Sequence, residues 1–266
     1  MASAPAVTHD TLFAGQLTCL QHRDGYRFAI DAVLLAHFAA PRPGEMVLEL
    51  GAGNGVVSLI MAYRQPQFAI TALELQPQLV GLMRSNVALN HYGERITVVE
   101  GDCRFLADQV PAGAFDRVVM NPPYRKIDSG RQNPGDEAAQ ARHELTLTLD
   151  EAVAAMAFAL KNRGRGVVVY PAERLATLVA AMKARRLEPK RLQVVYSYPG
   201  DTGRLVLVEA VKNGGEELAV LPPFFIYQTP GGPHSEEMAL LYAPCRENLK
   251  KQRHITPESR DVAGVR

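Results

Sequence analysis

The sequence contains few cysteines and no long apolar run. Its three cysteines, Cys19, Cys103 and Cys245, are far apart, with no CxxC pair and no Cys/His group at zinc-ligand spacing. This argues against a disulfide-stapled domain and a zinc finger, and we expect no metal. No apolar run approaches the roughly 18 residues of a membrane helix, and the N-terminus lacks a basic-then-apolar leader. We therefore expect a cytoplasmic protein without a membrane segment.

An excess of positive charge is also absent. The 266-residue chain has 29 Lys and Arg against 28 Asp and Glu, which gives a formal net charge of +1. Binding of nucleic acid through bulk charge is therefore not indicated. Residues 1–120 hold 8 basic and 11 acidic residues, whereas the remainder holds 21 and 17. This mild asymmetry fits a solvated surface about as well as a binding partner.

Apolar runs with strand and helix periods alternate along most of the chain. The pattern predicts seven strands, at 46–50, 68–73, 96–99, 115–120, 166–170, 192–198 and 204–211. The main helices are predicted at 56–64, 76–90, 149–161 and 172–186. Strands that alternate with helices form right-handed βαβ units. We therefore expect an α/β fold with helices on both faces of a mostly parallel sheet, whose last two strands form an antiparallel hairpin.

The flanks differ in pattern from this central part, which we place at residues 46–243. Residues 1–45 predict a loose arm, a short hairpin that turns at Asp24-Gly25, and a helix over 29–40. Residues 222–227 fit a further short strand. Residues 244–266 have little apolar content and predict a polar tail. We expect the protein to be a monomer.

A strand that ends in two prolines lies near the middle of the chain. Asn121 follows the apolar run 115–120, and the next two residues, Pro122 and Pro123, interrupt strand and helix alike because proline has no backbone N–H. Asn121 is thereby presented at a strand's carboxyl end, where open α/β sheets bind ligands. Its amide oxygen and the Pro122 carbonyl can accept both hydrogens of a planar NH₂ group, which frees the nitrogen lone pair to act as a nucleophile. Tyr124 offers a face for stacking a base. The alternative is that this segment is only a turn.

Three other strand ends carry residues suited to a cofactor. Residues 51–55, Gly-Ala-Gly-Asn-Gly, follow a strand and open a helix, and glycines let the backbone approach a ligand closely. Their spacing is not that of the nicotinamide fingerprint. Glu74 follows the second strand and can bind both hydroxyls of a ribose, whereas Asp102 follows the third and can reach an adenine amine. With Asn121 they predict one binding rim. The alternative is helix capping by Asp102 and a solvated Glu74.

Together these motifs resemble a known family. Segment 49–55 (Glu-Leu-Gly-Ala-Gly-Asn-Gly), Glu74, Asp102 and segment 121–124 (Asn-Pro-Pro-Tyr) are similar to class I S-adenosylmethionine-dependent methyltransferases of exocyclic amines. Segments 25–36 and 141–144 resemble one branch, the bacterial methyltransferases of adenosine N6 beside the anticodon of a valine tRNA. The resemblance covers about residues 12–242. It implies a Rossmann-like seven-stranded sheet and S-adenosyl-L-methionine as cofactor.

The resemblance also implies roles for particular residues. Asn121, Pro122 and Tyr124 would be catalytic. Gly51, Gly53 and Gly55 would line the methionine end of the cofactor. The complete cofactor set that it implies is Tyr26, Arg27, Phe28, Glu49, Gly51, Gly53, Gly55, Glu74, Leu75, Asp102, Cys103 and Asn121. For Tyr26 and Phe28, core packing explains the residue type equally well.

A base must leave its stack to enter such a pocket, and an adenosine in an RNA loop is extruded more easily than one in a duplex. The predicted substrate is therefore tRNA, with the target in the anticodon loop. The polar stretch 127–141 indicates a loop over the target pocket. The candidate phosphate contacts are Arg125, Lys126, Arg131 and Arg142.

Other functions use similar motifs. One alternative is methylation of a protein glutamine side chain, whose amide presents the same NH₂ group. Enzymes of that type resemble this chain in motif but carry a helical domain ahead of the glycine motif, and the roughly 45 residues that precede it here are too few for that domain and the hairpin. A methyltransferase of guanine amines in ribosomal RNA is a second alternative. A DNA adenine methyltransferase needs a large recognition insertion that is not visible here. A binding module without chemistry is disfavoured by the intact Asn121 and Tyr124.

Overall fold

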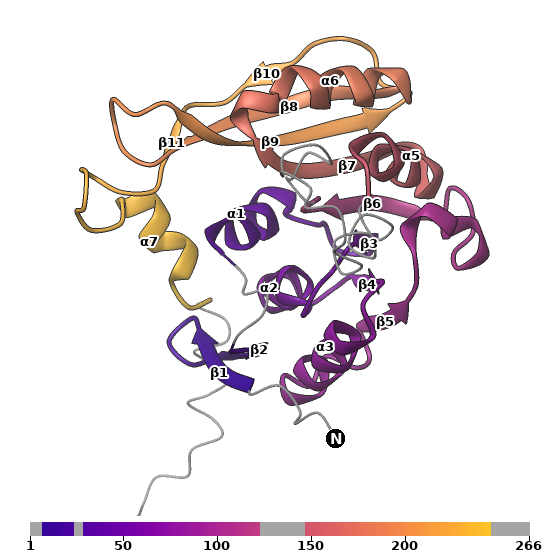
Figure 1. The fold of residues 1–266 in the computed structure, drawn as a ribbon, viewed down its shortest axis with the longest axis horizontal. Helices are drawn as coiled ribbons and strands as arrows, with labels where there is room; N and C mark the ends of the chain where they lie inside the picture. The colour runs from indigo at the N-terminus through magenta and orange to yellow at the C-terminus, as the bar shows by residue number, and fades with distance from the viewer. Residues whose placement is uncertain (1–6, 24–28, 123–146, 246–266) are drawn as a thin grey trace, which may run out of the picture.

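A large sheet forms the centre of the molecule (Figure 1), in a computed structural model that describes residues 7–23, 29–122 and 147–245. In spatial order its strands are β10 (Ala219–Val220), β8 (Leu187–Tyr196), β9 (Gly203–Lys212), β7 (Leu160–Pro171), β6 (Phe115–Met120), β3 (Met46–Leu50), β4 (Ala69–Glu74) and β5 (Ile96–Glu100). β11 (Phe224–Phe225) also pairs with β8. Strands β3 to β7 are parallel, and β9 runs antiparallel to both β7 and β8. The predicted α/β fold is confirmed, with β10 and β11 as short additions at the edge.

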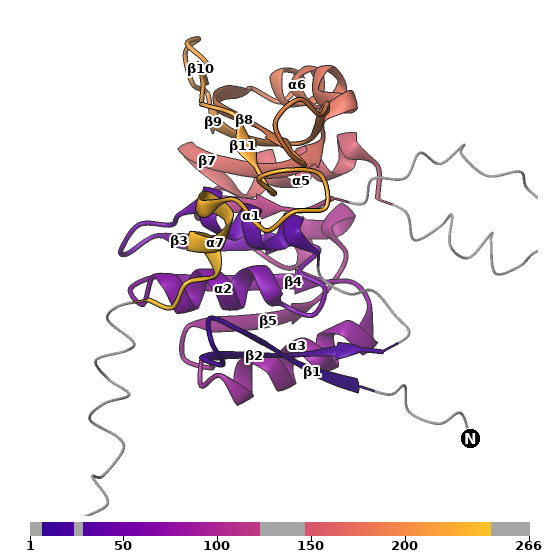
Figure 2. The same cartoon turned by 90° about the vertical axis from the view of Figure 1, so that its left-hand side faces the viewer.

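Helices cover both faces of the sheet because alternate residues of the central strands point to opposite sides. Val119 packs with α1 (Ile30–Ala39), α2 (Val56–Arg64) and α3 (Pro77–Leu89), whereas its neighbours Val118 and Met120 pack with the helices of the other face. That second face is covered by η1 (Cys103–Asp108), α5 (Leu149–Ala159) and α6 (Leu175–Ala184), which follows η2 (Ala172–Arg174). Figures 1 and 2 show the two layers of helices.

Two strands begin five or six residues earlier than predicted, in each case where an irregular residue interrupts the apolar pattern. β7 begins at Leu160, and its pairing with β6 shifts register over Asp116, opposite a segment in which Arg163 has φ 65°. β8 begins at Leu187 and shifts register next to Pro189, which has no N–H to donate to a ladder. The prediction of 149–161 as helix and 192–198 as strand was wrong at these boundaries.

The N-terminal hairpin is also different from the prediction. β2 (Leu17–His22) pairs antiparallel with β1 (Val7–Leu12), within residues predicted to be a loose arm. The turn between them contains Phe13 and Ala14, both at positive φ. β1 was missed because it is mostly polar and largely exposed. The hairpin turn that was predicted at Asp24-Gly25 lies outside the described residues.

The hairpin lies beside α3 (Figure 2), and it is fastened there by the amide side chains of Asn86, within the helix, and Asn90, its C-cap. Asn86 accepts from Leu20 N at 2.6 Å and donates to Leu20 O at 3.1 Å, and Asn90 makes the same pair of bonds with Thr18. Asn86 is fully buried and also donates to Asn54 O at 2.9 Å. The hairpin is therefore tied both to α3 and to the glycine-rich turn after β3.

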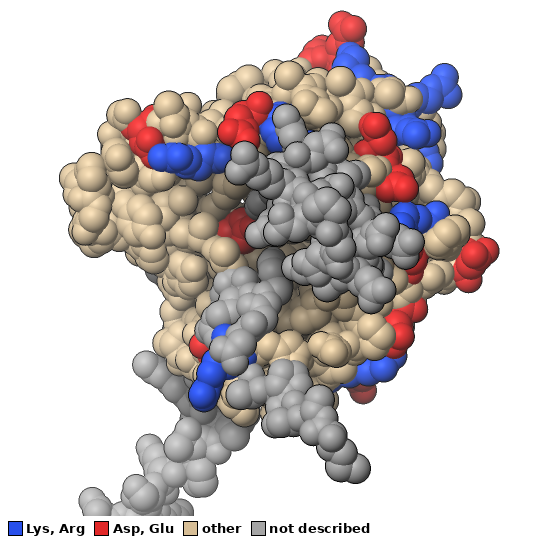
Figure 3. All heavy atoms as spheres, in the orientation of Figure 1, with Lys and Arg blue, Asp and Glu red and all other residues tan. Residues whose placement is uncertain are grey.

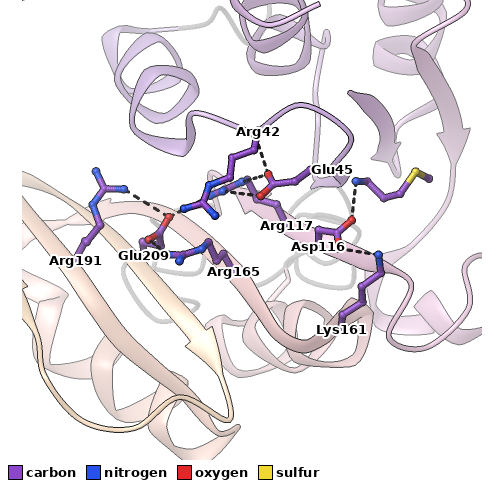
Figure 4. A network of polar contacts seen from close by, with 9 residues as sticks. Arg42, Glu45, Asp116, Arg117, Lys161, Arg165, Arg191 and Glu209 are labelled. Carbon is purple, nitrogen blue, oxygen red and sulfur yellow. Dashed lines mark hydrogen bonds and ion pairs between the residues drawn. The ribbon is translucent and has the colours of Figure 1, made fainter. Parts of the chain in front are cut away.

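A network of charges closes the opposite, amino-terminal end of the central strands (Figure 4). Arg117 of β6 is 2% exposed and pairs with Glu45 at 2.9 Å and with Glu209 of β9 at 3.1 Å. Glu209 is equally buried and also pairs with Arg165 at 2.6 Å and Arg191 at 3.6 Å. Since buried charges are tolerated only when they are paired, this network fixes how β6, β7, β8 and β9 align.

The C-terminal part of the described chain returns to α2. Helix α7 (Glu236–Tyr242), which was not predicted, is capped by Ser235, whose hydroxyl accepts from Met238 N at 3.0 Å. Arg64 at the end of α2 donates to Leu241 O at 2.6 Å and Ala243 O at 2.9 Å. Cys245, at the start of the predicted tail, donates its N–H to the Tyr63 hydroxyl at 2.9 Å.

Candidate cofactor and amine site

The strand order reverses between β3 and β6, and the predicted site residues gather at this point. Leu73, Leu50 and Met120 form one registered row across β4, β3 and β6. The next residue on each strand is Glu74, Gly51 and Asn121, respectively. These three therefore stand side by side at the carboxyl edge of the sheet, which is where doubly wound sheets bind their ligands.

The turn after β3 brings its backbone to the edge of an open space. Gly51 has φ 67°, and a side chain added there would meet nothing within 4 Å. Gly55 has φ 85° and begins α2, and a Cβ at that position would lie 2.7 Å from Met83 Cγ. The positive φ favours glycine at both positions, and at Gly55 the close packing against Met83 favours it as well. At Gly51 the absence of a side chain keeps the space open.

That space is a cavity of about 500 Å³. Of the predicted cofactor and catalytic residues, the described ones on its wall are Glu49, Gly51, Gly53, Glu74, Leu75, Asp102, Cys103, Asn121 and Pro122. Gly55 lies behind the turn and is not among the lining residues. The remaining predicted site residues lie outside the described part of the chain, namely Tyr26, Arg27, Phe28, Tyr124, Arg125, Lys126, Arg131 and Arg142.

Two carboxyl groups, Glu49 and Glu74, stand at the glycine turn in different hydrogen-bonding environments. Glu74 accepts from Gly53 N at 2.8 Å and from Gln76 N at 2.9 Å, which fixes its side chain at the cavity wall. Glu49 accepts from Ser58 N at 3.0 Å and from the Ser58 hydroxyl. Burial, with a smaller contribution from the nearby Glu74, raises the pKa of Glu49 to about 8, although the hydrogen bonds from Ser58 lower it. Glu49 is therefore mainly protonated at neutral pH.

Asp102 stands at the far side of the cavity with its carboxylate already engaged. Its oxygens accept from Arg104 N at 2.9 Å, from Nε at 2.9 and 3.1 Å and from Nη2 at 2.6 Å. These side-chain hydrogen bonds from Arg104 lower the pKa of Asp102. An ionised carboxylate offers about four lone-pair sites. An adenine amine at Asp102 would therefore have to share the carboxylate with the Arg104 guanidinium, a competition that the sequence did not reveal. Burial raises the pKa of the adjacent Cys103 to about 11, so its thiol is uncharged.

Asn121 has a partner that the sequence analysis did not identify as a site residue. Its Nδ2 donates to Asp31 Oδ2 at 3.1 Å, and both residues line the cavity. Asp31 lies in the first turn of α1 and is 9% exposed. The available signal was a carboxylate inside a helix whose only other polar side chain is His37, since charged residues are seldom buried without a partner.

This arrangement fits S-adenosyl-L-methionine. The cavity is lined by apolar side chains with a few polar groups, and the carboxyl groups of Glu49 and Glu74 stand next to a glycine turn that leaves room for a ligand. Within the described residues no cluster of three metal-ligating side chains occurs. No helix in that part of the chain has the length and apolar character needed to cross a bilayer.

A family model described as the methyltransferase small domain matches residues 30–165, a range that includes every described cavity residue. The chain belongs to this family. It is an S-adenosyl-L-methionine-dependent methyltransferase, as the motifs predicted.

Curated relatives support the predicted branch. A Bacteroides thetaiotaomicron protein named tRNA1(Val) (adenine(37)-N6)-methyltransferase is 32% identical, over 74% of this chain and 82% of the relative. A protein of the same name from a Flavobacteriaceae bacterium is 27% identical, over 84% of this methyltransferase and 92% of the relative.

Solved structures confirm the fold. An Agrobacterium tumefaciens protein described as a predicted O-methyltransferase superposes with a TM-score of 0.66 at 21% identity, over 80% of this chain and 95% of that one. TYW2 of Pyrococcus horikoshii, solved with MeSAdo, gives 0.55 at 17% identity, over 80% and 74%. At these identities the similarity concerns the fold alone.

Replacing Glu74 with alanine tests the cofactor position. We expect the affinity for S-adenosyl-L-methionine to fall by about 10- to 150-fold, because a hydrogen bond to a buried charged group is worth about 1.5–3 kcal/mol. Isothermal titration calorimetry measures the change. Glu100→Ala is the matched control. Glu100 lies opposite Glu74 in the register of β4 and β5, but it is exposed and outside the cavity wall. Equal affinities of the two variants would remove Glu74 from the site.

Proposed function

We propose that this methyltransferase modifies the exocyclic amine N6 of an adenosine in tRNA, within the anticodon loop of a valine tRNA. The names of the curated relatives support this substrate. The structural observation that carries the proposal is the amide of Asn121, which stands on the wall of the cavity that also contains Glu74 and Asp102. An acceptor at this place is what a nucleophilic amine needs beside a methyl donor. With a tRNA substrate, we expect the enzyme to act in the cytoplasm.

Different cavity residues would contact different parts of the cofactor. Glu74 would hold the ribose hydroxyls, Asp102 with Cys103 would contact the adenine, and the turn at Gly51 and Gly53 would accommodate the methionine end. When bound, S-adenosyl-L-methionine supplies a methyl group on a positively charged sulfur, so that the amine nitrogen takes the carbon, the bonding pair stays on sulfur and the nitrogen releases one proton.

The protein's contribution is to position and polarise the amine. The Asn121 oxygen and the Pro122 carbonyl would accept the two amine hydrogens, which turns the nitrogen lone pair toward the methyl carbon. These contacts strengthen as positive charge develops on the nitrogen, and they therefore act mainly in the transition state. The released proton passes to solvent, so that no carboxylate has to act as a base.

Substrate identity is tested by methyl transfer from radiolabelled cofactor to total tRNA, ribosomal RNA and a glutamine-containing release-factor peptide in parallel. We expect label in tRNA, and nucleoside mass spectrometry should identify it as N6-methyladenosine. The same mass spectrometry on RNA from cells with and without the gene locates the modified tRNA. Label in ribosomal RNA alone or in the peptide alone would refute the tRNA proposal and retain the amine chemistry.

RNA binding is expected to depend on the basic residues that follow Asn121. On the face drawn in Figure 3, the described surface has acidic and basic side chains interspersed, without a broad positive field. Replacing Arg125, Lys126, Arg131 and Arg142 by alanine should weaken tRNA binding and spare cofactor binding. Each lost phosphate contact should reduce the salt dependence by about 0.7 log units per log unit of salt. Filter binding over a salt series measures this slope, with the exposed Arg84→Ala on α3 as control. A slope equal to that of the control would exclude these residues as phosphate contacts.

A further inference from the structure

Asp31 and Asn121 are 90 positions apart in sequence, and the fold brings them together at the cavity wall. Asp31 Oδ1 accepts from the Ala32 backbone N–H at 2.8 Å, which holds the carboxylate in place, and Oδ2 accepts from Asn121 Nδ2 at 3.1 Å. The first element is the opening turn of α1 and the second is the carboxyl end of β6. The contact therefore joins α1 to the end of β6, the strand that presents the Asn121 amide.

The chemistry of this contact is directional. A carboxylate only accepts hydrogen bonds, whereas an amide has a donating and an accepting end. Asp31 thus selects the orientation in which the Asn121 side-chain nitrogen faces the carboxylate and the side-chain oxygen lies on the side away from it. In the reversed orientation two acceptor oxygens would face each other at Asp31, and an NH₂ group would be presented to a substrate NH₂ group. Charge on one end of a hydrogen-bonded amide also polarises the other end.

We propose that Asp31 is a positioning residue for methyl transfer: it orients and polarises the Asn121 amide so that its oxygen accepts from the target amine. This inference rests on the proposed function, because the amine is the group that Asn121 would bind. Asp31 acts through Asn121 and does not itself touch the reacting atoms.

A purely structural role makes a different prediction. An aspartate in the first turn of a helix stabilises the helix through its dipole, whatever the neighbouring strand carries. Asp150 provides a matched control, because it is the second residue of α5 just as Asp31 is the second residue of α1, and it is exposed. Asp150→Asn should retain the wild-type turnover number.

The decisive experiment exchanges the two side chains. Asp31→Asn should lower kcat by about 10- to 100-fold, as expected for weakening a charged hydrogen bond in the transition state, with the cofactor Kd unchanged. Asn121→Asp should lower kcat by a larger factor than Asp31→Asn does, because two carboxylates would then face each other. In the double variant, the amide at position 31 donates to the carboxylate at position 121, whose other oxygen accepts from the amine. The double variant should therefore recover at least about tenfold over Asn121→Asp.

A substrate-free readout separates this inference from the proposed function. The side-chain amide resonances of Asn121, assigned by their loss in Asn121→Asp, should show a hydrogen-bonded proton that moves upfield and exchanges faster in Asp31→Ala. Unchanged resonances overturn the inference whichever substrate is methylated. Wild-type kcat in Asp31→Asn, or a double variant no more active than Asn121→Asp, also overturns it. If the methyl label appears in ribosomal RNA or in the peptide instead of tRNA, the kcat values of the variants are measured with that substrate.

Discussion

Asn121→Ala is expected to lower methyl transfer by about 10²- to 10³-fold or more while cofactor binding stays intact, because removing one preorganised group that stabilises developing charge has effects of this size. In the structure Asn121 is one residue beyond the Leu50–Met120 pair of the sheet, beside the glycine turn and in contact with Asp31. The substitution leaves Glu74, Asp102 and the turn itself in place. A single-turnover assay with labelled cofactor measures the chemical step, and calorimetry measures cofactor affinity.

The control for this experiment is Asn162→Ala, which removes an exposed amide in β7. It should leave both quantities unchanged. Tyr124→Ala should also be severe, with a larger part of its effect on substrate binding because the ring is expected to stack on the target base. If Asn121→Ala retained near wild-type turnover, polarisation of the amine by this residue would be ruled out.

Glu209→Ala is expected to produce the largest loss of stability, about 3–5 kcal/mol in the free energy of unfolding. Glu209 is buried and paired with Arg117, Arg165 and Arg191 (Figure 4). Without it, the Arg117 guanidinium stays buried with Glu45 as its remaining ion-pair partner among the described residues. Leaving a charge inadequately paired in the interior is more costly than losing the attraction itself.

Urea unfolding followed by circular dichroism measures this loss. Lys183→Ala removes one member of the exposed Lys183–Glu188 pair and should change stability by less than about 1 kcal/mol. Cofactor affinity should be preserved in folded Glu209→Ala protein, since the network lies at the opposite end of the strands from the cavity. A stability equal to that of the Lys183 variant would show that the buried network contributes nothing.

The part of the fold that could be predicted is the part in which local pattern and tertiary structure agree. The run ending at Met120 is apolar on both faces, as expected for a central parallel strand, and its end was located correctly. β1 was missed because its polar, exposed residues lack such a pattern. The boundaries of β7 and β8 were misplaced because Arg163 and Pro189 stand at irregular pairings.

For the candidate site, the sequence predicted which residues stand at the strand ends, but not the contacts that those residues make. Glu74, Gly51 and Asn121 were placed at one rim from the order of strands alone, and the structure brings them together. The contacts that modify them come from elsewhere in the sequence or depend on side-chain geometry. Asp31 reaches Asn121 only through the packing of α1, and the competition of Arg104 for Asp102 follows from the turn at η1.

The two asparagines at the C-terminal end of α3, Asn86 and the C-cap Asn90, have a consequence for association with other chains. A strand at the margin of a sheet exposes unpaired N–H and C=O groups that can recruit a further strand and start aggregation. Asn86 and Asn90 are one helical turn apart, and their amides meet the backbone groups of Leu20 and Thr18 as a neighbouring strand would. A helix here substitutes for the next strand and ends the small sheet. This protection uses no charge, so it is insensitive to salt and to pH near neutrality.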